Sequence, residues 1–321
     1  MNQRNLLMKY FKIIFMGTPD FAVPVLEKLI NDGHEILAVV TQPDRKRGRG
    51  KAVSFSPIKQ IALENNLKVI QPERIRKKDV VAELREFNPD LFITCAYGQI
   101  LSQAVLDIPK FGCINVHASL LPEYRGAAPI HRAVMNGNKT TGITTMMTDR
   151  GMDTGDILLK SEVKIGENTT SGELHDMLMI TGAELISETL FKLGEGTLLR
   201  IPQDDTRATH APMLKKEESI VEWNSDSKSI HDKVRALNPW PGCFTKYMGK
   251  RMRIIRSGFS DIEHQKNPGT VTDVDKEKME IACGTGYLYI YELQFENGKA
   301  MEISQCWHNI ESGIVLGQGG K

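Results

Sequence analysis

The sequence predicts the α/β fold class: a doubly wound, mostly parallel sheet followed by a small β-barrel. In the first two thirds of the 321 residues, short apolar runs alternate with helical patterns, which is typical of βαβ units. Near residues 202–212 this periodicity stops, and Asp, Thr, Ala and Pro dominate. Short strand-like segments separated by turns follow. These observations predict two domains of different architecture.

Apolar runs and helical periodicity assign the elements of the first part. We predict strands at residues 12–16, 36–40, 68–70, 91–96, 112–117 and 142–148. We predict helices at residues 20–31, 58–65, 79–87, 127–136 and 171–193. The run 91–96 is mostly apolar, as in a strand that is buried on both faces. This order of elements predicts a Rossmann-like sheet.

The second part has a different pattern. A helical segment at 227–235 and a Pro-rich turn at 239–242 precede short strand-like segments. We predict these strands at residues 244–248, 251–255, 269–274, 279–283 and 287–293. Five short strands with Gly-rich turns favour an OB-like barrel. We therefore expect a catalytic domain at 1–203, a linker at 204–214 and a C-terminal domain at 215–321.

Composition limits the classes of function. The chain is 40% hydrophobic and 25% charged with a formal net charge of +1, which is ordinary for a globular protein. Any polyanionic partner must therefore bind a local basic patch. The five cysteines form no C-x-x-C pair, which indicates a reducing, cytoplasmic compartment. No ligand spacing of the zinc type occurs and no apolar run is long enough to cross a bilayer, so we expect no metal and no membrane partner.

Polar side chains cluster near the end of one predicted strand. Asn115 and His117 lie two residues apart on the strand at 112–117, so both leave the same face. Ligands of open parallel sheets bind at the carboxyl ends of the strands. An amide donor beside an imidazole suits a carbonyl oxygen that becomes negative during acyl transfer. By itself, the pair is more typical of a half-buried structural histidine and a turn asparagine.

Two further loops carry candidate chemistry. Asp153 lies in a Gly-Met-Asp-Thr-Gly-Asp loop whose glycines let the backbone approach a ligand, although such aspartates also form simple Asx turns. Gly17 follows the first strand where a dinucleotide-binding protein carries several glycines. A single glycine does not make that fingerprint, which counts against a nicotinamide dehydrogenase.

A long motif resembles a known family. The sequence Asn-Val-His-x-Ser-Leu-Leu-Pro-x-Tyr-Arg-Gly-Ala-Ala-Pro-Ile starts at Asn115, and Met-Asp-Thr-Gly-Asp follows at 152–156. Together they resemble the signature of the folate-dependent formyltransferases. The likeness extends to segments 13–22, 41–45 and 238–242, and so covers nearly the whole chain. Within the family, the chain is similar to the members that act on methionyl-tRNA.

The resemblance implies a reaction and a catalytic set. A formyl group would move from 10-formyltetrahydrofolate to the amine of initiator methionyl-tRNA, for translation initiation. Asn115 would hold the negative oxygen of the tetrahedral adduct, and His117 would support that oxygen or supply a proton. Asp153 would orient His117 and help to remove the amine proton. The implied folate segment consists of Ser119, Leu120, Leu121 and Pro122, where apolar side chains suit a flat pterin.

Two basic clusters bear on the acceptor. The first is a glycine-containing loop with Arg45, Lys46, Arg47, Arg49 and Lys51. The second comprises Lys246, Lys250, Arg251, Arg253 and Arg256. Either cluster alone is typical of a solvated surface, but two on a nearly neutral chain favour a polyanion. The resemblance implies that the loop, Arg49 above all, contacts the acceptor end of the tRNA and that the barrel binds its stem.

Three alternatives stay open at this point. A glycinamide ribonucleotide formyltransferase shares the motif but is about one domain long, which leaves the second part unexplained. A nucleotide-sugar formyltransferase also carries a second small domain, and only the basic loop and the segment after the first strand argue against it. A non-catalytic tRNA-binding protein has no need of Asn115, His117 and Asp153. We expect the chain to be a monomer.

Overall fold

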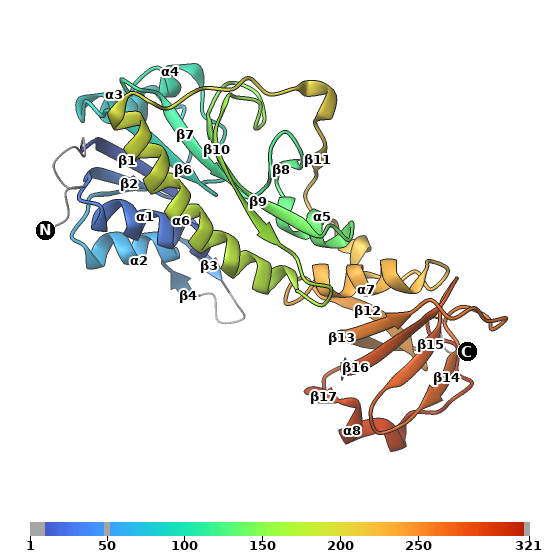
Figure 1. Cartoon of the computed structure of the whole chain (residues 1–321). Coiled ribbons are helices and arrows are strands. Elements are labelled where there is room, and N and C mark those ends of the chain that lie inside the picture. The colour runs from blue at the N-terminus through green and yellow to red at the C-terminus, as the bar shows by residue number, and fades with distance from the viewer. Residues whose placement is uncertain (1–9, 48–51, 318–321) are drawn as a thin grey trace, which may run out of the picture. The chain divides into compact units, whose positions relative to one another are not determined.

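The computed structural model describes residues 10–47 and 52–317, which form two compact units (Figure 1). The first unit comprises the chain up to residue 126 together with residues 141–163 and 175–210. The second comprises residues 127–140, 164–174 and the chain from 211 onward. The chain therefore passes between the units several times. For example, α5 (Pro129–Met135) belongs to the second unit, although the elements before it belong to the first.

A seven-stranded sheet forms the centre of the first unit, in the order β10-β9-β7-β6-β1-β2-β5. Its strands are β1 (Lys12–Gly17), β2 (Glu35–Val40), β5 (Val69–Ile70), β6 (Leu91–Cys95), β7 (Cys113–His117), β9 (Thr140–Met147) and β10 (Ile157–Lys164). The ladders from β5 to β7 are parallel, and β9 runs antiparallel to β7. The predicted α/β class with a mostly parallel sheet is confirmed.

Helices cover both faces of this sheet. They are α1 (Val23–Asn31), α2 (Pro57–Glu64), α3 (Lys78–Glu86), α4 (Gln103–Leu106) and α6 (Ser171–Glu195). The helices α1, α2 and α6 lie side by side on one face (Figure 1), where Ser187 of α6 donates a hydrogen bond to Asp32 after α1. On the other face, strand residues such as Ile14 and Phe92 pack against apolar residues of α3 and α4. Burial on both faces explains why β6 is buried at every position.

The strand order locates a crevice. The chain runs from β1 to β2 and β5 on one side and then returns to place β6 and β7 on the other side of β1. The reversal lies between β1 and β6. In doubly wound sheets, ligands bind outside the carboxyl ends of the strands at this point. The residues that follow β1 and β6 are therefore placed to meet a ligand.

Some elements were not expected from the sequence. The basic segment predicted as a loop contains an antiparallel hairpin, β3 (Arg45–Arg47) with β4 (Ala52–Ser54). Its strands are short and largely polar, so they lack the alternation by which strands are recognised. The structure adds β10, whose Lys160, Ser161 and Glu162 interrupt the apolar pattern, and the short β8 (Arg125–Gly126) and β11 (His210–Ala211). Short 3-10 helices occur at Asp20–Ala22, Asp205–Arg207, Lys216–Ser219 and Trp307–Asn309.

An antiparallel sheet dominates the second unit, in the order β12-β13-β16-β15-β14, with β17 also paired to β16. The strands are β12 (Cys243–Tyr247), β13 (Lys250–Ser260), β14 (Val271–Val274), β15 (Met279–Ala282), β16 (Tyr287–Phe295) and β17 (Ala300–Glu302). The helices α7 (Ser227–Ala236) and α8 (Ile303–Cys306) complete this part. Residues from α7 and the strands share one core, which contains Trp223, Ile230 and Leu288. The predicted short strands are confirmed, and their closure into an OB-like barrel stays a prediction.

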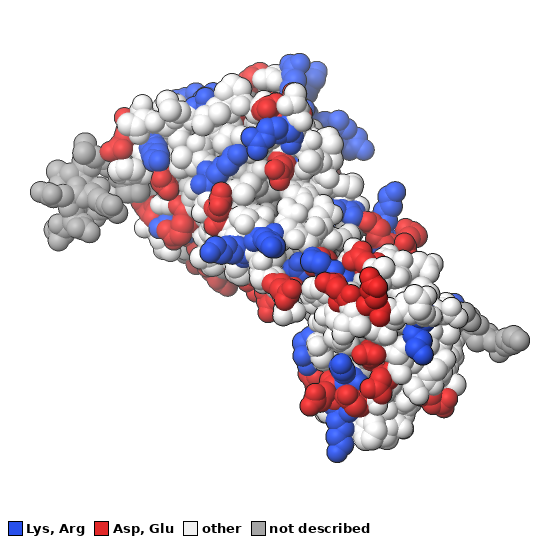
Figure 2. All heavy atoms as spheres, turned by 45° about the vertical axis from the view of Figure 1, so that its right-hand side comes forward, with Lys and Arg blue, Asp and Glu red and all other residues white. Residues whose placement is uncertain are grey.

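Charged side chains of both signs are mixed on one face of the molecule. Figure 2 shows basic and acidic groups interspersed on this face of both units, as the net charge of +1 leads one to expect. Within the described residues, no helix has the length and apolar character needed to cross a membrane.

Candidate active site

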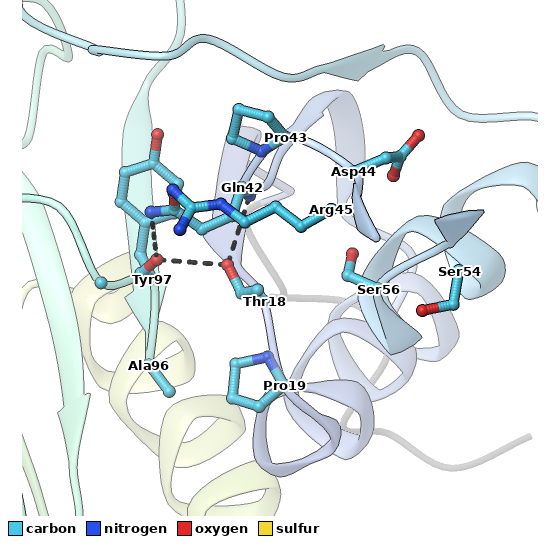
Figure 3. Close-up of a pocket in the computed structure, with 11 residues that line it drawn as sticks. Thr18, Pro19, Gln42, Pro43, Asp44, Arg45, Ser54, Ser56, Ala96 and Tyr97 are labelled. Carbon is cyan, nitrogen blue, oxygen red and sulfur yellow. Dashed lines mark hydrogen bonds between the residues drawn. The ribbon is translucent and has the colours of Figure 1, made fainter. Parts of the chain in front are cut away.

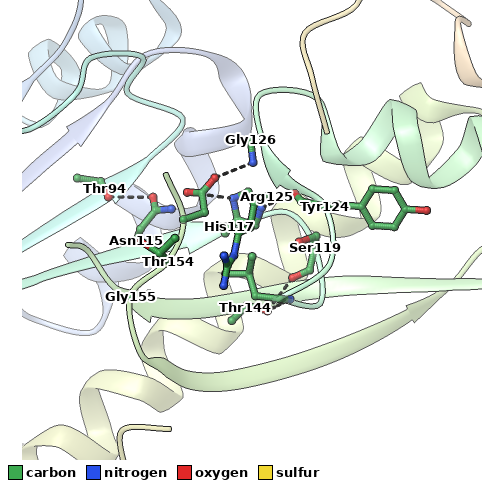
Figure 4. Close-up of polar contacts among 12 residues, drawn as sticks. Thr94, Asn115, His117, Ser119, Tyr124, Arg125, Gly126, Thr144, Thr154 and Gly155 are labelled. Atoms are coloured by element: carbon green, nitrogen blue, oxygen red, sulfur yellow. Dashed lines mark hydrogen bonds and ion pairs between the residues drawn. The ribbon is translucent and has the colours of Figure 1, made fainter. Parts of the chain in front are cut away.

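Asn115, His117 and Asp153 come together in the first unit (Figure 4). Asn115 and His117 lie on β7 close to its carboxyl end, and Asp153 lies in the loop between β9 and β10. His117 Nδ1 is 3.7 Å from Asp153 Oδ1. Both side chains are largely buried, with exposed fractions of 7% for His117 and 19% for Asp153. The structure therefore gathers the three residues in which the sequence predicts chemistry.

The second ring nitrogen of His117 fixes the orientation of the imidazole. Its Nε2 lies 3.0 Å from the carbonyl oxygen of Tyr124. A carbonyl only accepts hydrogen bonds, so Nε2 carries the hydrogen in this contact. The lone pair of the neutral ring is consequently on Nδ1, which faces the Asp153 carboxylate. The ring is ready to accept a proton at the nitrogen that faces the site.

A neighbouring strand fixes the amide of Asn115. The hydroxyl of Thr94, on β6, donates to Asn115 Oδ1 at 2.9 Å. This contact uses the amide oxygen and leaves the two Nδ2 hydrogens to point toward a ligand. A neutral N–H donor held in this way suits a developing negative oxygen, because it need not reorient during the reaction.

The loop of Asp153 has a tightly determined backbone. Asp153 adopts a φ of +56°, which is uncommon for a residue other than glycine. Its Oδ2 accepts the backbone N–H of Gly126 at 2.8 Å. Gly155 lies so close to the strand that an added Cβ would overlap the carbonyl oxygen of Met147. The glycine therefore permits the close approach that turns Asp153 toward His117.

The predicted folate segment is closely packed. Ser119 donates its hydroxyl to the carbonyl of Glu123 at 2.6 Å, and Thr144 bonds both the carbonyl of Ser119 and the N–H of Leu121. Leu121 is fully buried and packs with Met146 and Ile157. Leu120 is half-buried and Pro122 is buried. The segment thus offers a rigid wall beside His117, in which Leu120 is the more accessible leucine.

A pocket of about 380 Å³ opens at the switch between β1 and β6 (Figure 3). Thr18 and Gln42 both donate hydrogen bonds of 3.1 Å to the carbonyl oxygen of Tyr97, which ties together the ends of β1, β2 and β6. The pocket is lined by Thr18, Pro19, Gln42, Pro43, Asp44, Arg45, Ser54, Ser56, Ala96, Tyr97 and Gly98. Its lining is mixed, with hydroxyl, amide and charged groups, and this mixture suits a polar ligand.

The base of the β3–β4 hairpin is anchored beside this pocket. Asp44 forms an ion pair with Lys59 of α2 and accepts a hydrogen bond of 2.9 Å from Gln71. These contacts, the Lys59 hydrogen bond first, hold the pKa of Asp44 below its usual value. At the other end of the hairpin, Ser56 bonds the Thr41 hydroxyl at 2.9 Å. Both ends of the basic segment are therefore bonded to other parts of the first unit.

The predicted tRNA-binding residues are placed unequally. Arg45 lines the pocket, and Lys46 and Arg47 continue β3, whereas Arg49 and Lys51 lie outside the described residues. In the second cluster, Arg253 donates to the carbonyl of Pro239, and the Arg251 guanidinium stacks 3.5 Å above the Phe244 ring. Arg256 pairs with Glu302, which offsets its charge, whereas Lys246 and Lys250 are exposed.

The cysteines and the metal-binding residue types give no second site. All five cysteines are free and buried, and burial raises the pKa of the Cys113 thiol, on β7 itself, to about 11. A thiol in this state is a poor nucleophile at neutral pH. Across the part of the chain that the structure describes, no group of three or more His, Cys, Asp or Glu residues could hold a metal ion.

Comparison with known proteins identifies the family. Residues 11–190 match the family described as formyl transferase, and residues 213–310 match the formyl transferase C-terminal domain. A methionyl-tRNA formyltransferase from Acetivibrio thermocellus is 49% identical over 310 residues, which cover 96% of this chain and 100% of that protein. The methionyl-tRNA formyltransferase of Clostridioides difficile is 45% identical over 308 residues, or 95% of this chain and 100% of that protein. This chain belongs to the formyl transferase family.

Two solved structures of other proteins share the fold. An N-formyltransferase from Helicobacter canadensis, in complex with folinic acid and dTDP-3-aminofucose, has a TM-score of 0.65 at 20% identity, over 87% of this chain and 98% of that chain. HypX from Aquifex aeolicus, in complex with tetrahydrofolic acid, has a TM-score of 0.62 at 18% identity, over 92% of this chain and 47% of that chain. At such identities, the likeness shows the fold alone.

Within this formyl transferase, several polar partners of the site were not predicted. The Thr94 hydroxyl, the Tyr124 carbonyl and the Gly126 N–H each bond one of the predicted residues. Two of these groups belong to the backbone, so no side-chain type reveals them. Thr94 is a polar residue inside a buried apolar strand, and such a residue needs a hydrogen-bond partner. This need for a partner was the signal in the sequence that could have pointed to Thr94.

Proposed function

We propose that this chain transfers the formyl group of 10-formyltetrahydrofolate to the free amino group of initiator methionyl-tRNA, giving formylmethionyl-tRNA for translation initiation. The observation that carries the proposal is the arrangement of Asn115, His117 and Asp153 at the carboxyl end of β7. Membership of the formyl transferase family and the close methionyl-tRNA formyltransferase relatives support it.

The site residues have distinct roles in this reaction. The amine attacks the formyl carbon, and the carbonyl oxygen takes up the negative charge. Asn115 donates an Nδ2 hydrogen to that oxygen, in a position fixed by Thr94. His117 and Asp153 receive the proton that the amine loses. The C–N bond to the folate then breaks, and the folate nitrogen leaves with a proton in place of the formyl group.

The separation of His117 and Asp153 is suited to this proton transfer. At 3.7 Å, their facing atoms are too far apart for a direct hydrogen bond. The attacking amine or a water molecule that lies to one side of the pair can bond both atoms. Once His117 is protonated, the adjacent carboxylate stabilises the imidazolium. The resulting acid can then protonate the leaving nitrogen.

The two substrates approach from different sides in this proposal. The formyl donor binds against Ser119, Leu120, Leu121 and Pro122, where the half-buried Leu120 faces a flat ring system. The methionyl end of the tRNA enters the polar pocket between β1 and β6, which Arg45 lines. Thr94 bonds Asn115, and the pocket residues Ala96–Gly98 follow on the same chain segment. The pocket therefore leads toward the amide that holds the reacting oxygen.

The basic residues and the second part of the chain extend this binding surface. We propose that Arg45, Lys46, Arg47, Arg49 and Lys51 contact phosphates of the acceptor end, and that the domain at 215–321 binds the stem. We further propose that residues 1–203 are the catalytic domain and 204–214 the linker. The free, buried cysteines support a cytoplasmic setting. A monomer suffices, because the three catalytic residues come from one chain.

Formylation of methionyl initiator tRNA by the purified protein tests the proposal. The variant Asn115→Ala should lose activity by about 100-fold or more, with unchanged melting temperature and folate binding. Gln60→Ala, which removes an exposed amide on α2, is the matched control. A wild-type protein that binds folate but does not formylate the tRNA would rule out this acceptor. A nucleotide-linked amino sugar would then be the acceptor to test, since sugar N-formyltransferases share the fold at 18–20% identity.

A further inference from the structure

The segment 201–209 connects the two loops that flank His117. At one end, Ile201 pairs with Ile157, at the start of β10, through two backbone hydrogen bonds of 2.8 and 2.9 Å. At the other end, Thr209 bonds the backbone of residues 122–125 at distances from 2.8 to 3.3 Å. The composition of this segment is typical of a linker, yet it is bonded to both sides of the site.

Gln203 lies in the middle of this segment, and its amide is fully used. Its Nε2 donates to the carbonyl oxygens of Asp153 and Gly155, at 2.9 and 2.7 Å. Its Oε1 accepts two N–H groups from Arg125, at 3.1 and 2.9 Å. A guanidinium only donates and a carbonyl only accepts, so these partners determine which way the amide points. All four hydrogen-bonding positions of the amide are occupied.

The side chain that holds Gln203 is itself fixed. Arg125 is only 6% exposed, and a buried guanidinium requires acceptors. Gln203 supplies one of them, and Asp205 supplies another through an ion pair of 2.7 Å. Arg125 and Gly126 are neighbours in sequence, and the N–H of Gly126 bonds the Asp153 carboxylate. Two connected groups therefore hold Asp153, one at its backbone and one at its side chain.

The backbone of Asp153 needs such support. A φ of +56° is unfavourable for an aspartate, and the loop around it is partly exposed. Gln203 bonds the carbonyl of Asp153 itself and that of Gly155 two residues later, so it spans the strained position. Without these bonds, the loop is free to relax, and the carboxylate moves away from His117.

We propose that Gln203 is a positioning residue for catalysis. It keeps Asp153 facing His117 through its hydrogen bonds to the Asp153 loop, and buried Arg125 holds the Gln203 amide in place. This inference rests on the proposed role of Asp153 in formyl transfer. It assigns part of the catalytic geometry to a segment that lies just before the predicted linker. Because a displacement of about 1 Å can reduce a rate by about 100-fold, loss of this support should reduce kcat.

The variant Gln203→Glu tests the proposal with little change of shape. The carboxylate still accepts from Arg125, but its other oxygen faces two carbonyl oxygens and has no hydrogen to donate. We expect kcat to fall about 10- to 100-fold, with the KM of each substrate within about twofold of wild type. Gln60→Glu makes the same chemical change at an exposed site on α2 and should leave both constants unchanged. A kcat equal to that of wild type would overturn the proposal.

A double variant separates positioning from general stability. If Gln203 acts through Asp153, then Gln203→Leu should slow the wild-type enzyme but add less than a twofold loss to Asp153→Asn. Losses that multiply would overturn the proposal. Melting temperatures of all four proteins identify any variant that loses folded structure, and Gln203→Glu then replaces Gln203→Leu in the cycle.

A measurement without turnover keeps this inference distinct from the proposed function. The crystal structure of Gln203→Glu shows where the Asp153 carboxylate lies. The distance between His117 Nδ1 and Asp153 Oδ1 should exceed the 3.7 Å of the wild type, whichever amine is the true acceptor. An unchanged distance would overturn the positioning role even if methionyl-tRNA is formylated. Absence of tRNA formylation together with a longer distance would refute only the acceptor.

Discussion

Thr94 donates a hydrogen bond of 2.9 Å to the amide oxygen of Asn115, between neighbouring parallel strands. Thr94 is buried, and its strand is buried at each position. The contact decides which end of the amide faces a ligand, because the oxygen is occupied and the Nδ2 hydrogens are available. Thr94 thereby determines which group of Asn115 is available for the proposed contact with the substrate.

Replacement of Thr94 by Val should therefore reduce catalysis without weakening substrate binding. The methyl group keeps the volume but leaves the Asn115 oxygen without its partner, so the amide can rotate. We expect kcat to fall about tenfold to 100-fold, which approaches the loss of one oxyanion donor. Steady-state kinetics with both substrates measure it. Thr94→Ser, which keeps the hydroxyl, should stay within about threefold of wild type; an equal loss in both variants would contradict the argument.

The sequence predicted the fold and the three residues that lie together at the proposed active site, but not the groups that hold those residues. Apolar periodicity is local, so it identified the strands of the main sheet and the short strands of the second unit. The β3–β4 hairpin was not predicted, because its strands are short and largely polar. Gln203 and the Tyr124 carbonyl act through hydrogen bonds between segments far apart in the chain. Neither residue type nor spacing encodes such contacts, which exist only once the chain has folded.

Gly155→Ala should damage both stability and activity. The added Cβ overlaps the carbonyl of Met147, so the loop must shift, at a cost of about 1–3 kcal/mol in the free energy of unfolding. The same shift displaces Asp153 and lowers kcat. Gly196→Ala is the control. Its φ of +71° costs an alanine about 1 kcal/mol, but nothing lies within 4 Å of the added Cβ, so no overlap with a neighbour contributes. Denaturant unfolding and kinetics of both variants test this; normal kcat in Gly155→Ala would show that the loop tolerates the shift.

Removal of basic side chains from the segment 45–49 should weaken tRNA binding and make that binding less dependent on the salt concentration. In a variant with Arg45, Arg47 and Arg49 changed to Ala, we expect the KM for methionyl-tRNA to rise and that for the formyl donor to stay unchanged. Each lost phosphate contact should reduce the slope of log affinity against log salt by about 1. Changing the exposed Arg76, Lys77 and Lys78 to Ala removes the same charge elsewhere. Equal slopes in the two triple variants would mean that the hairpin makes no specific phosphate contacts.

Stability of the second unit should depend on the protonation of His231. This buried side chain lies 3.0 Å from the Ser257 hydroxyl and 3.1 Å from the carbonyl of Glu167, and burial lowers its pKa below the ordinary value of 6.5. The unfolded chain therefore binds a proton more readily than the folded one. The stabilisation is complete above pH 6.5 and is lost as the pH falls through the lower folded pKa.

The melting temperature measured between pH 8 and pH 5 tests the predicted direction of this pH dependence. The melting temperature of the wild type should fall below about pH 6.5, and His231→Gln, which can still donate to Glu167, should show a flatter profile. His34 is a second buried histidine, and burial lowers its pKa as well. The His231→Gln variant should therefore retain part of the pH dependence. Parallel profiles for the wild type and His231→Gln would mean that His231 does not contribute. A wild-type melting temperature that rises toward pH 5 would contradict the direction of its pKa shift.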